Sequence, residues 1–174
     1  MTLANTITLF RLFLVPLLVA FLFSEAEVAK YWAAALFLIA GLSDCLDGHL
    51  ARRRDEVSVF GKVVDPLADK LIVLTALFAL VKRGLVNIWL AIVLLVKEAV
   101  LVLGAAWLIC VKRRVISAHV WGKVAAVVLY AGTFLTILEL SWGPVLMAMG
   151  VSISLAAGLY YLFVALTGST EEIG

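Results

Sequence analysis

Two pairs of aspartates lie between residues 43 and 70, in a chain that is otherwise mostly hydrophobic. Asp44 and Asp47 are three residues apart, so in a helix they share one face. Asp65 and Asp69 are four residues apart and share a face in the same way. Carboxylate oxygens in this arrangement form the kind of cage that hard divalent cations such as Mg²⁺ prefer. The spacing therefore predicts a metal site at two helix ends that are joined by a short basic loop.

Solvated charges at helix ends are the alternative interpretation of these aspartates. Carboxylates are costly near hydrocarbon, so four of them need a partner that offsets the cost. Solvation accounts for one or two such residues. It does not account for two in-phase pairs, with Gly48 beside one pair and Gly61 one turn before the other. The metal interpretation is therefore favoured.

The residues next to the first pair suit a ligand that carries phosphate groups. Gly48 has no side chain, so a flat base or a phosphate can approach the backbone there. Ala51 keeps the next turn small, and Arg52 offers a planar fork for phosphate oxygens. Arg53 and Arg54 are interpreted as ordinary basic residues of a cytoplasmic loop.

The spacing of these positions resembles the signature of the CDP-alcohol phosphotransferases, which are membrane enzymes of phospholipid synthesis. Eight residues fit D-x2-D-G-x2-A-R-x8-G-x3-D-x3-D without a gap: Asp44, Asp47, Gly48, Ala51, Arg52, Gly61, Asp65 and Asp69. The stretch from Phe60 to Lys70 is most similar to the branches that make phosphatidylglycerol phosphate and cardiolipin. Eight specified positions at fixed spacing make a strong signal.

The resemblance implies transfer of a phosphatidyl group from CDP-diacylglycerol to an alcohol, with release of CMP. It implies one or two Mg²⁺ ions, with Mn²⁺ as a substitute, and the metal ligands Asp44, Asp47, Asp65 and Asp69. Asp69 is also the expected general base for the acceptor hydroxyl. The expected CDP-binding residues are Asn5, Thr8, Arg11, Asp47, Gly48, Ala51, Arg52, Ser58 and Gly61.

Asn5, Thr8 and Arg11 recur every three residues at the start of the first hydrophobic segment. One interpretation is a helix cap at Asn5 or Thr6 and an arginine that snorkels to the membrane surface. The favoured interpretation is a polar stripe that faces a nucleotide, because an arginine one turn into a span usually has a partner. The stripe resembles an N-x2-T-x2-R element of the same family.

The acceptor alcohol is less well specified, and sn-glycerol 3-phosphate is the best prediction. Phosphatidylglycerol, serine and inositol phosphate remain open. Lys97 and Glu98 lie in the middle of a span, which is costly unless they are paired or face a polar cavity. Family members that make phosphatidylglycerol phosphate usually have Arg-Glu there, so Lys97 is a departure. Lys123 could bind the acceptor or snorkel to the headgroups. The candidate acceptor-binding residues are Lys97, Arg113, Arg114 and Lys123.

The elements that must position these residues are hydrophobic helices. Hydrophobic residues make up 65% of the 174 residues, and the mean hydropathy is +1.15, which is typical of an integral membrane protein. The length allows about six spans of about 20 residues. We therefore predict a single all-α domain, residues 1–174, that forms a bundle of six transmembrane helices. The predicted spans are Thr6–Phe23, Tyr31–Leu50, Val63–Val81, Leu85–Val111, Val115–Leu138 and Pro144–Leu166.

Charge sets the predicted orientation and excludes some functions. The loops on the side of the termini contain seven basic residues and the opposite loops contain three, which places the termini and the aspartates in the cytoplasm. We expect a homodimer in a bacterial cytoplasmic membrane. A net charge of +2 gives no indication of nucleic-acid binding, and two cysteines make no disulfide framework. A cation transporter is disfavoured, because the carboxylates gather at one membrane face and no internal repeat is visible.

Overall fold

The computed structural model describes the backbone of residues 3–54, 59–107 and 120–167, and the side chains of residues 13–43, 71–101 and 120–160. The described chain is built of α-helices, which confirms the predicted all-α class. The helices are α1 Leu3–Leu22, α2 Ala29–Arg54, α3 Val59–Lys82, α4 Ile88–Trp107, α5 Val120–Ile137 and α6 Gly143–Thr167. Each predicted span corresponds to one of these helices, in the same order.

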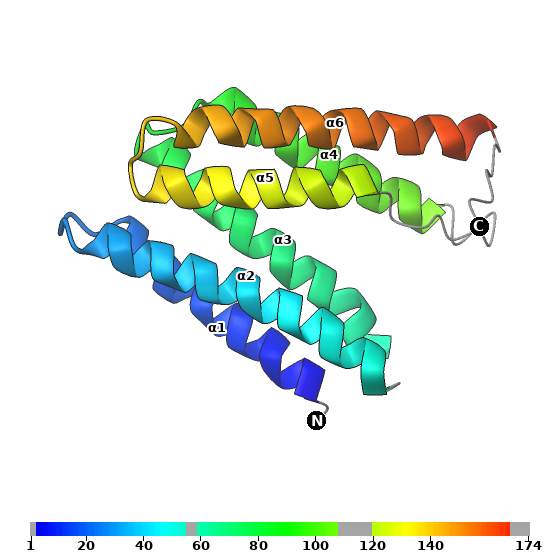
Figure 1. Ribbon diagram of the computed structural model, residues 1–174, viewed down its shortest axis with the longest axis horizontal. Helices are drawn as coiled ribbons and strands as arrows, with labels where there is room; N and C mark the ends of the chain where they lie inside the picture. Colours follow the sequence, from blue (N-terminus) through cyan, green and yellow to red (C-terminus); the bar gives the residue numbers. More distant parts are fainter. Residues whose placement is uncertain (1–2, 55–58, 108–119, 168–174) are drawn as a thin grey trace.

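Successive helices run back and forth, as Figure 1 shows. The first helix, α1, packs against both α2 and α3, while α5 packs along α6. Helix α4 contacts α3 and α6, and α5 contacts α2 and α3. The molecule therefore has a three-helix part formed by α1–α3 and a helical hairpin formed by α5 and α6, with α4 beside the hairpin (Figure 1).

Several helix boundaries predicted from the sequence were wrong. Helix α4 begins at Ile88 rather than Leu85, because Gly84 takes a left-handed φ of 73° and the Asn87 side chain caps the helix. The cap is a hydrogen bond of 3.0 Å from the Trp89 N–H to Asn87 Oδ1. Helix α2 continues to Arg54 and α3 already begins at Val59, so the basic residues predicted for the loop are helical.

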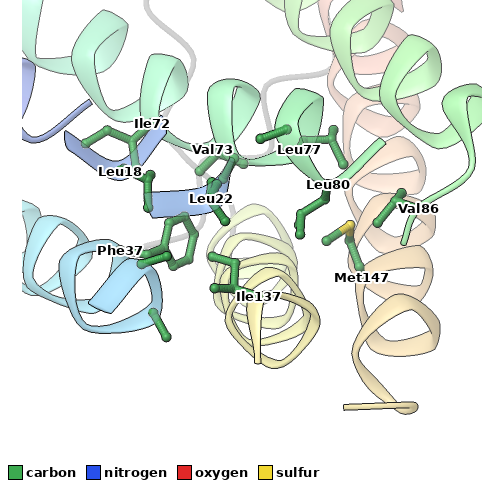
Figure 2. Packing of buried hydrophobic residues seen from close by; sticks show 14 of the residues in the cluster. Leu18, Leu22, Phe37, Ile72, Val73, Leu77, Leu80, Val86, Ile137 and Met147 are labelled. Atoms are coloured by element: carbon green, nitrogen blue, oxygen red, sulfur yellow. The ribbon is translucent and has the colours of Figure 1, made fainter. Parts of the chain in front are cut away.

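The core lies where the three-helix part meets the hairpin. Figure 2 shows Leu18 and Leu22 of α1 close to Phe37 of α2, with Ile137 of α5 beside them. Each of these side chains is at most 2% exposed. The Phe37 ring also stacks on Tyr130 of α5, with ring centroids 4.8 Å apart. This packing holds α1 and α2 against the second half of α5.

Glycines allow α5 and α6 to approach each other closely. A Cβ added at Gly150 of α6 would lie 2.6 Å from the backbone nitrogen of Leu129 on α5. A Cβ at Gly143 would lie 2.5 Å from the backbone nitrogen of Thr136. Small residues at such positions are typical of helix pairs in membranes, where backbones pack directly on one another. The hairpin is therefore a rigid unit.

The outer surface of the described helices is apolar. Helices α5 and α6 contain the windows Val120–Ile137 and Gly143–Tyr160, which are long and apolar enough to cross a membrane. Only 33% and 22% of these windows are buried inside the protein, whereas the core helix of a soluble protein is mostly buried. Large apolar side chains such as Phe13, Phe78 and Leu95 are exposed on other helices as well. This surface favours a lipid environment.

Candidate active site

The two aspartate pairs lie on adjacent antiparallel helices. Asp44 and Asp47 are in the last part of α2, and Asp65 and Asp69 are in the first part of α3. At 1.5 Å per residue, Asp47 and Asp65 are both roughly 10 Å along their helices from the connecting segment 55–58. Asp44 and Asp69 are both roughly 15 Å from it. The backbone thus brings the pairs to matching levels on neighbouring helices.

Helix α1 brings the amino-terminal stripe to the same end of the molecule. Figure 1 shows the start of α1 next to the end of α2 and the start of α3. Asn5, Thr8 and Arg11 lie in the first turns of α1. The helix begins at Leu3, so neither Asn5 nor Thr6 is its cap, and the capping interpretation was wrong. The interpretation as a ligand-facing stripe stays a prediction.

For the other candidate residues, the structure gives only their positions along the helices. Gly48, Ala51 and Arg52 lie in the last turns of α2, and Gly61 lies in the first turn of α3. Ser58, Arg113 and Arg114 lie outside the described residues. The side chains of the aspartates also lie outside them, so their mutual distances stay predictions. Among the side chains that are described, no group of three or more histidines, cysteines or acids gathers to hold a metal.

The donor set on α2 and α3 fits Mg²⁺. Four carboxylates supply only oxygen ligands, and Mg²⁺ prefers oxygen to nitrogen or sulfur. A single Mg²⁺ in proteins usually takes one or two carboxylates, together with water and substrate phosphate oxygens. Four carboxylates are more than one Mg²⁺ usually takes, so the set has enough ligands for a second ion.

Lys97 and Glu98 lie in the middle of α4 and are paired with each other, as the cost of isolated charges in a span predicts. The Lys97 ammonium also donates a hydrogen bond of 2.7 Å to Ser154 Oγ on α6. The two charged side chains are 11% and 19% exposed. The pair is thus held between two helices rather than open to the surroundings.

Lys123 has a different environment. Its side chain is exposed on α5, on the same outward face as Val120 and Val127, which are each 68% exposed. It lies in the first turns of the helix, where a lysine can extend its ammonium to the membrane surface. The geometry favours this alternative, and an acceptor-binding role for Lys123 stays a prediction.

Sequence reasoning missed an ion-pair cluster at the far end of the molecule, which is the end with the connections 23–28, 83–87 and 138–142. Glu139 accepts from Arg83 Nη2 at 2.6 Å and from Lys30 Nζ at 3.3 Å. Partial burial acts to raise the pKa of Glu139, but the hydrogen bonds and charges of Lys30 and Arg83 outweigh it and lower the pKa. Glu139 has a φ of 60°, which is uncommon for a residue other than glycine. Nothing in the local sequence indicates these partners.

Comparisons with known proteins agree with the sequence motif. The family model described as CDP-alcohol phosphatidyltransferase matches residues 1–160. A CDP-diacylglycerol–glycerol-3-phosphate 3-phosphatidyltransferase of Bacillus subtilis is 35% identical over 134 residues, which are 70% of this chain and 69% of the relative. A probable phosphatidylglycerophosphate synthase of Mycobacterium tuberculosis is 35% identical over 174 residues, covering 94% of this chain and 81% of the relative. A CMP-forming cardiolipin synthase of Streptomyces coelicolor is 36% identical over 104 residues, covering 58% and 48% of the two chains.

Proposed function

The chain belongs to the CDP-alcohol phosphatidyltransferase family, and we propose that it transfers a phosphatidyl group from CDP-diacylglycerol to sn-glycerol 3-phosphate. The products are phosphatidylglycerol phosphate and CMP. The names of the Bacillus subtilis and Mycobacterium tuberculosis relatives support this acceptor. The observation that carries the proposal is that α1 packs against α2 and α3. The parts of these helices that contain the amino-terminal stripe and the two aspartate pairs are at the same end of the molecule.

In this proposal the nucleotide half of the substrate is bound by α1 and α2. Arg52 and Arg11 supply planar cationic groups for the diphosphate, and Gly48 leaves space for the cytidine beside the helix backbone. Asp44, Asp47 and Asp65 hold Mg²⁺, which when bound neutralises charge on the diphosphate. Ser58 and Thr8 add hydroxyl groups for the nucleotide.

Asp69 acts on the other substrate. The acceptor hydroxyl is a poor nucleophile until a base takes its proton, and Asp69 accepts this proton as the hydroxyl oxygen attacks phosphorus. The bond from that phosphorus to the CMP oxygen breaks, and CMP leaves. Asp69 is one turn deeper along α3 than Asp65. This position is suited to an alcohol that arrives beyond the diphosphate. Lys97 binds the phosphate of the acceptor.

We further propose that all six helices cross the membrane, with the aspartates near the cytoplasmic face. Exposed aromatic side chains at the far end support this arrangement, because Trp and Tyr are enriched at membrane–water interfaces. Trp32 and Trp89 lie near the starts of α2 and α4, and Trp142 directly precedes α6; they are 58%, 68% and 77% exposed. Trp121, at the start of α5, is 65% exposed and marks the opposite interface. The excess of basic residues at the site end supports a cytoplasmic position.

The enzyme is proposed to be a homodimer in a bacterial cytoplasmic membrane, as all the relatives reported above are bacterial. We propose that a second copy of the protein packs against α4. In its described part only Leu94 is fully buried, while Leu95, Val96 and Val100 are each more than half exposed. The mass of the protein–detergent complex, measured by light scattering, tests this point.

The deciding experiment is an acceptor panel. The purified protein is incubated with CDP-diacylglycerol, Mg²⁺ and one alcohol at a time: glycerol 3-phosphate, phosphatidylglycerol, serine or inositol phosphate. CMP release and the mass of the lipid product are measured. Glycerol 3-phosphate should be the preferred acceptor. Preference for phosphatidylglycerol would instead make the protein a cardiolipin synthase, the second candidate, which the Streptomyces coelicolor relative favours.

A further inference from the structure

The inward face of α4 is a single stripe that contains two charges. Within the described part of α4, the least exposed residues follow helical spacing: Leu90, Ala91, Leu94, Lys97, Glu98 and Leu101. All other described side chains of this helix are exposed. Lys97 and Glu98 therefore occupy positions at which α4 packs against the protein. Apolar residues would be buried there at a lower cost in free energy. Charges at such positions need a reason beyond packing.

Ser154 fixes where the Lys97 ammonium lies. The hydroxyl accepts a hydrogen bond of 2.7 Å from Lys97 Nζ, across the interface between α4 and α6. Gly158, one turn further along α6, lies beside the lysine stem, because a Cβ there would make an ordinary contact of 3.9 Å with Lys97 Cγ. Helix α6 is itself held by its close packing on α5. The lysine is thus seated on a rigid surface rather than free to move on its flexible stem.

Among the described residues, the Lys97 ammonium has partners for two of its hydrogen-bond donors, and we assign the third to a ligand. A lysine ammonium has three N–H groups. Within the described side chains, Ser154 and Glu98 each take one of them. Glu98 also balances the charge, so the pair is tolerated inside a span. The third N–H suits a single phosphate oxygen, because lysine acts as a compact point charge.

Lys97 and Asp69 lie on two helices that contact each other, α4 and α3. Measured from the connection 83–87, Lys97 is roughly 14 Å along α4 and Asp69 is roughly 20 Å along α3. A small acceptor with a hydroxyl at Asp69 and a phosphate at Lys97 would therefore extend obliquely, from α3 to α4 and toward that connection.

We propose that Ser154 is a positioning residue for the acceptor: it orients Lys97 so that the free N–H meets the phosphate of an alcohol phosphate. This rests on the proposed function, in which Lys97 binds the acceptor. A purely structural role, as a polar link between α4 and α6, is the competing explanation. The two differ in which kinetic constant depends on the serine hydroxyl.

The test is Ser154→Ala, with Ser152→Ala as the matched control. Ser152 is on the same helix but exposed, and its hydroxyl donates to the carbonyl of Ala148 at 2.9 Å within α6. Ser154→Ala should raise the KM for glycerol 3-phosphate roughly 10-fold, the effect of one lost hydrogen bond to a charged group. The kcat and the KM for CDP-diacylglycerol should not change. Ser154→Thr, which keeps a hydroxyl, should restore the KM, and Ser152→Ala should behave as wild type.

The outcomes separate this inference from the proposed function. If wild type uses glycerol 3-phosphate and Ser154→Ala has an unchanged KM for it, the inference is overturned and the proposed function stands. A loss of kcat or of thermal stability without a change in that KM also overturns the inference, because a structural link would act in this way. If wild type releases CMP only with another alcohol, the acceptor assignment itself is wrong.

Discussion

Asp69 differs from the other three aspartates in its place along the chain. It is the last of the four and lies one turn beyond Asp65 on α3. Asp47 and Asp65 are at the level nearest to the connecting segment 55–58, where we expect the diphosphate of the lipid substrate to bind. Asp44 and Asp69 are one level deeper, and of these two only Asp69 is expected to act on the alcohol. We therefore expect the first three aspartates to act as metal ligands and Asp69 to act as the base.

Asp69→Asn tests this division. The amide keeps the shape and one carbonyl oxygen but cannot take a proton, so CMP release should fall by roughly 10²–10⁴-fold. Binding of CDP-diacylglycerol in the presence of Mg²⁺ should be retained, as measured by titration of the nucleotide lipid. Asp44→Asn is the control and should weaken this binding. Equal loss of binding in both variants would make Asp69 mainly a metal ligand.

Gly48→Val tests the space beside α2. The added side chain would fill the position at which the cytidine is expected to approach the backbone. The variant should insert and purify normally but lose affinity for CDP-diacylglycerol, measured by the same titration. Normal affinity would show that Gly48 matters only for the helix.

At the scale of the elements, hydropathy was enough to predict each helix and its order. It was not enough to predict every end. Asn87 and Gly84 set the start of α4 through a cap and a left-handed turn, which a hydrophobicity pattern does not contain. Helix α2 extends to Arg54 because arginine is a good helix former, although it is not hydrophobic.

The candidate site was predictable only where its residues are close in sequence. The aspartate signature spans 26 positions of one segment, from Asp44 to Asp69, so its spacing is visible directly. Ser154 is 57 residues from Lys97, and Glu139 is 109 residues from Lys30. Such partners depend on how α4 and the hairpin pack, and a single sequence does not specify this packing residue by residue.

Gly150→Ala tests the hairpin as an element. The new Cβ would lie 2.6 Å from the Leu129 backbone nitrogen, so α5 and α6 must separate and lose packing. We expect a clear fall in the melting temperature in detergent, equivalent to about 1–3 kcal/mol for overpacking. Gly158→Ala is the control on the same helix, because its nearest neighbours would be 3.9 Å away. Equal melting temperatures of the two variants would contradict the close packing.

At the scale of the whole molecule, the Glu139 cluster joins α2, the α3–α4 turn and the hairpin at the far end. The lowered pKa of Glu139 means that its stabilising effect is present above the carboxyl pKa of the unfolded chain. The effect is lost as the pH falls through the still lower pKa of the folded state. The melting temperature of wild type should therefore fall more steeply below about pH 4.5 than that of Glu139→Gln. Glu27→Gln, at an exposed position of the α1–α2 connection, should keep the wild-type dependence.

The orientation across the membrane decides whether the site can exchange CMP with the cytoplasm. Glu27 is exposed at the far end, and Arg54 closes α2 at the site end, so the two positions should lie on opposite sides of the membrane. The excess of basic residues at the site end predicts that Arg54 is inside.

Single cysteines at these positions, in a background with Cys45→Ala and Cys110→Ala, can be labelled with a membrane-impermeant maleimide. Because Cys45 stands between Asp44 and Asp47, CMP release of the background protein must first be shown to persist. In intact cells Glu27→Cys should react, and Arg54→Cys should react only after the cells are opened. Reaction of Arg54→Cys from outside would place the aspartates on the outer face and overturn the proposed orientation.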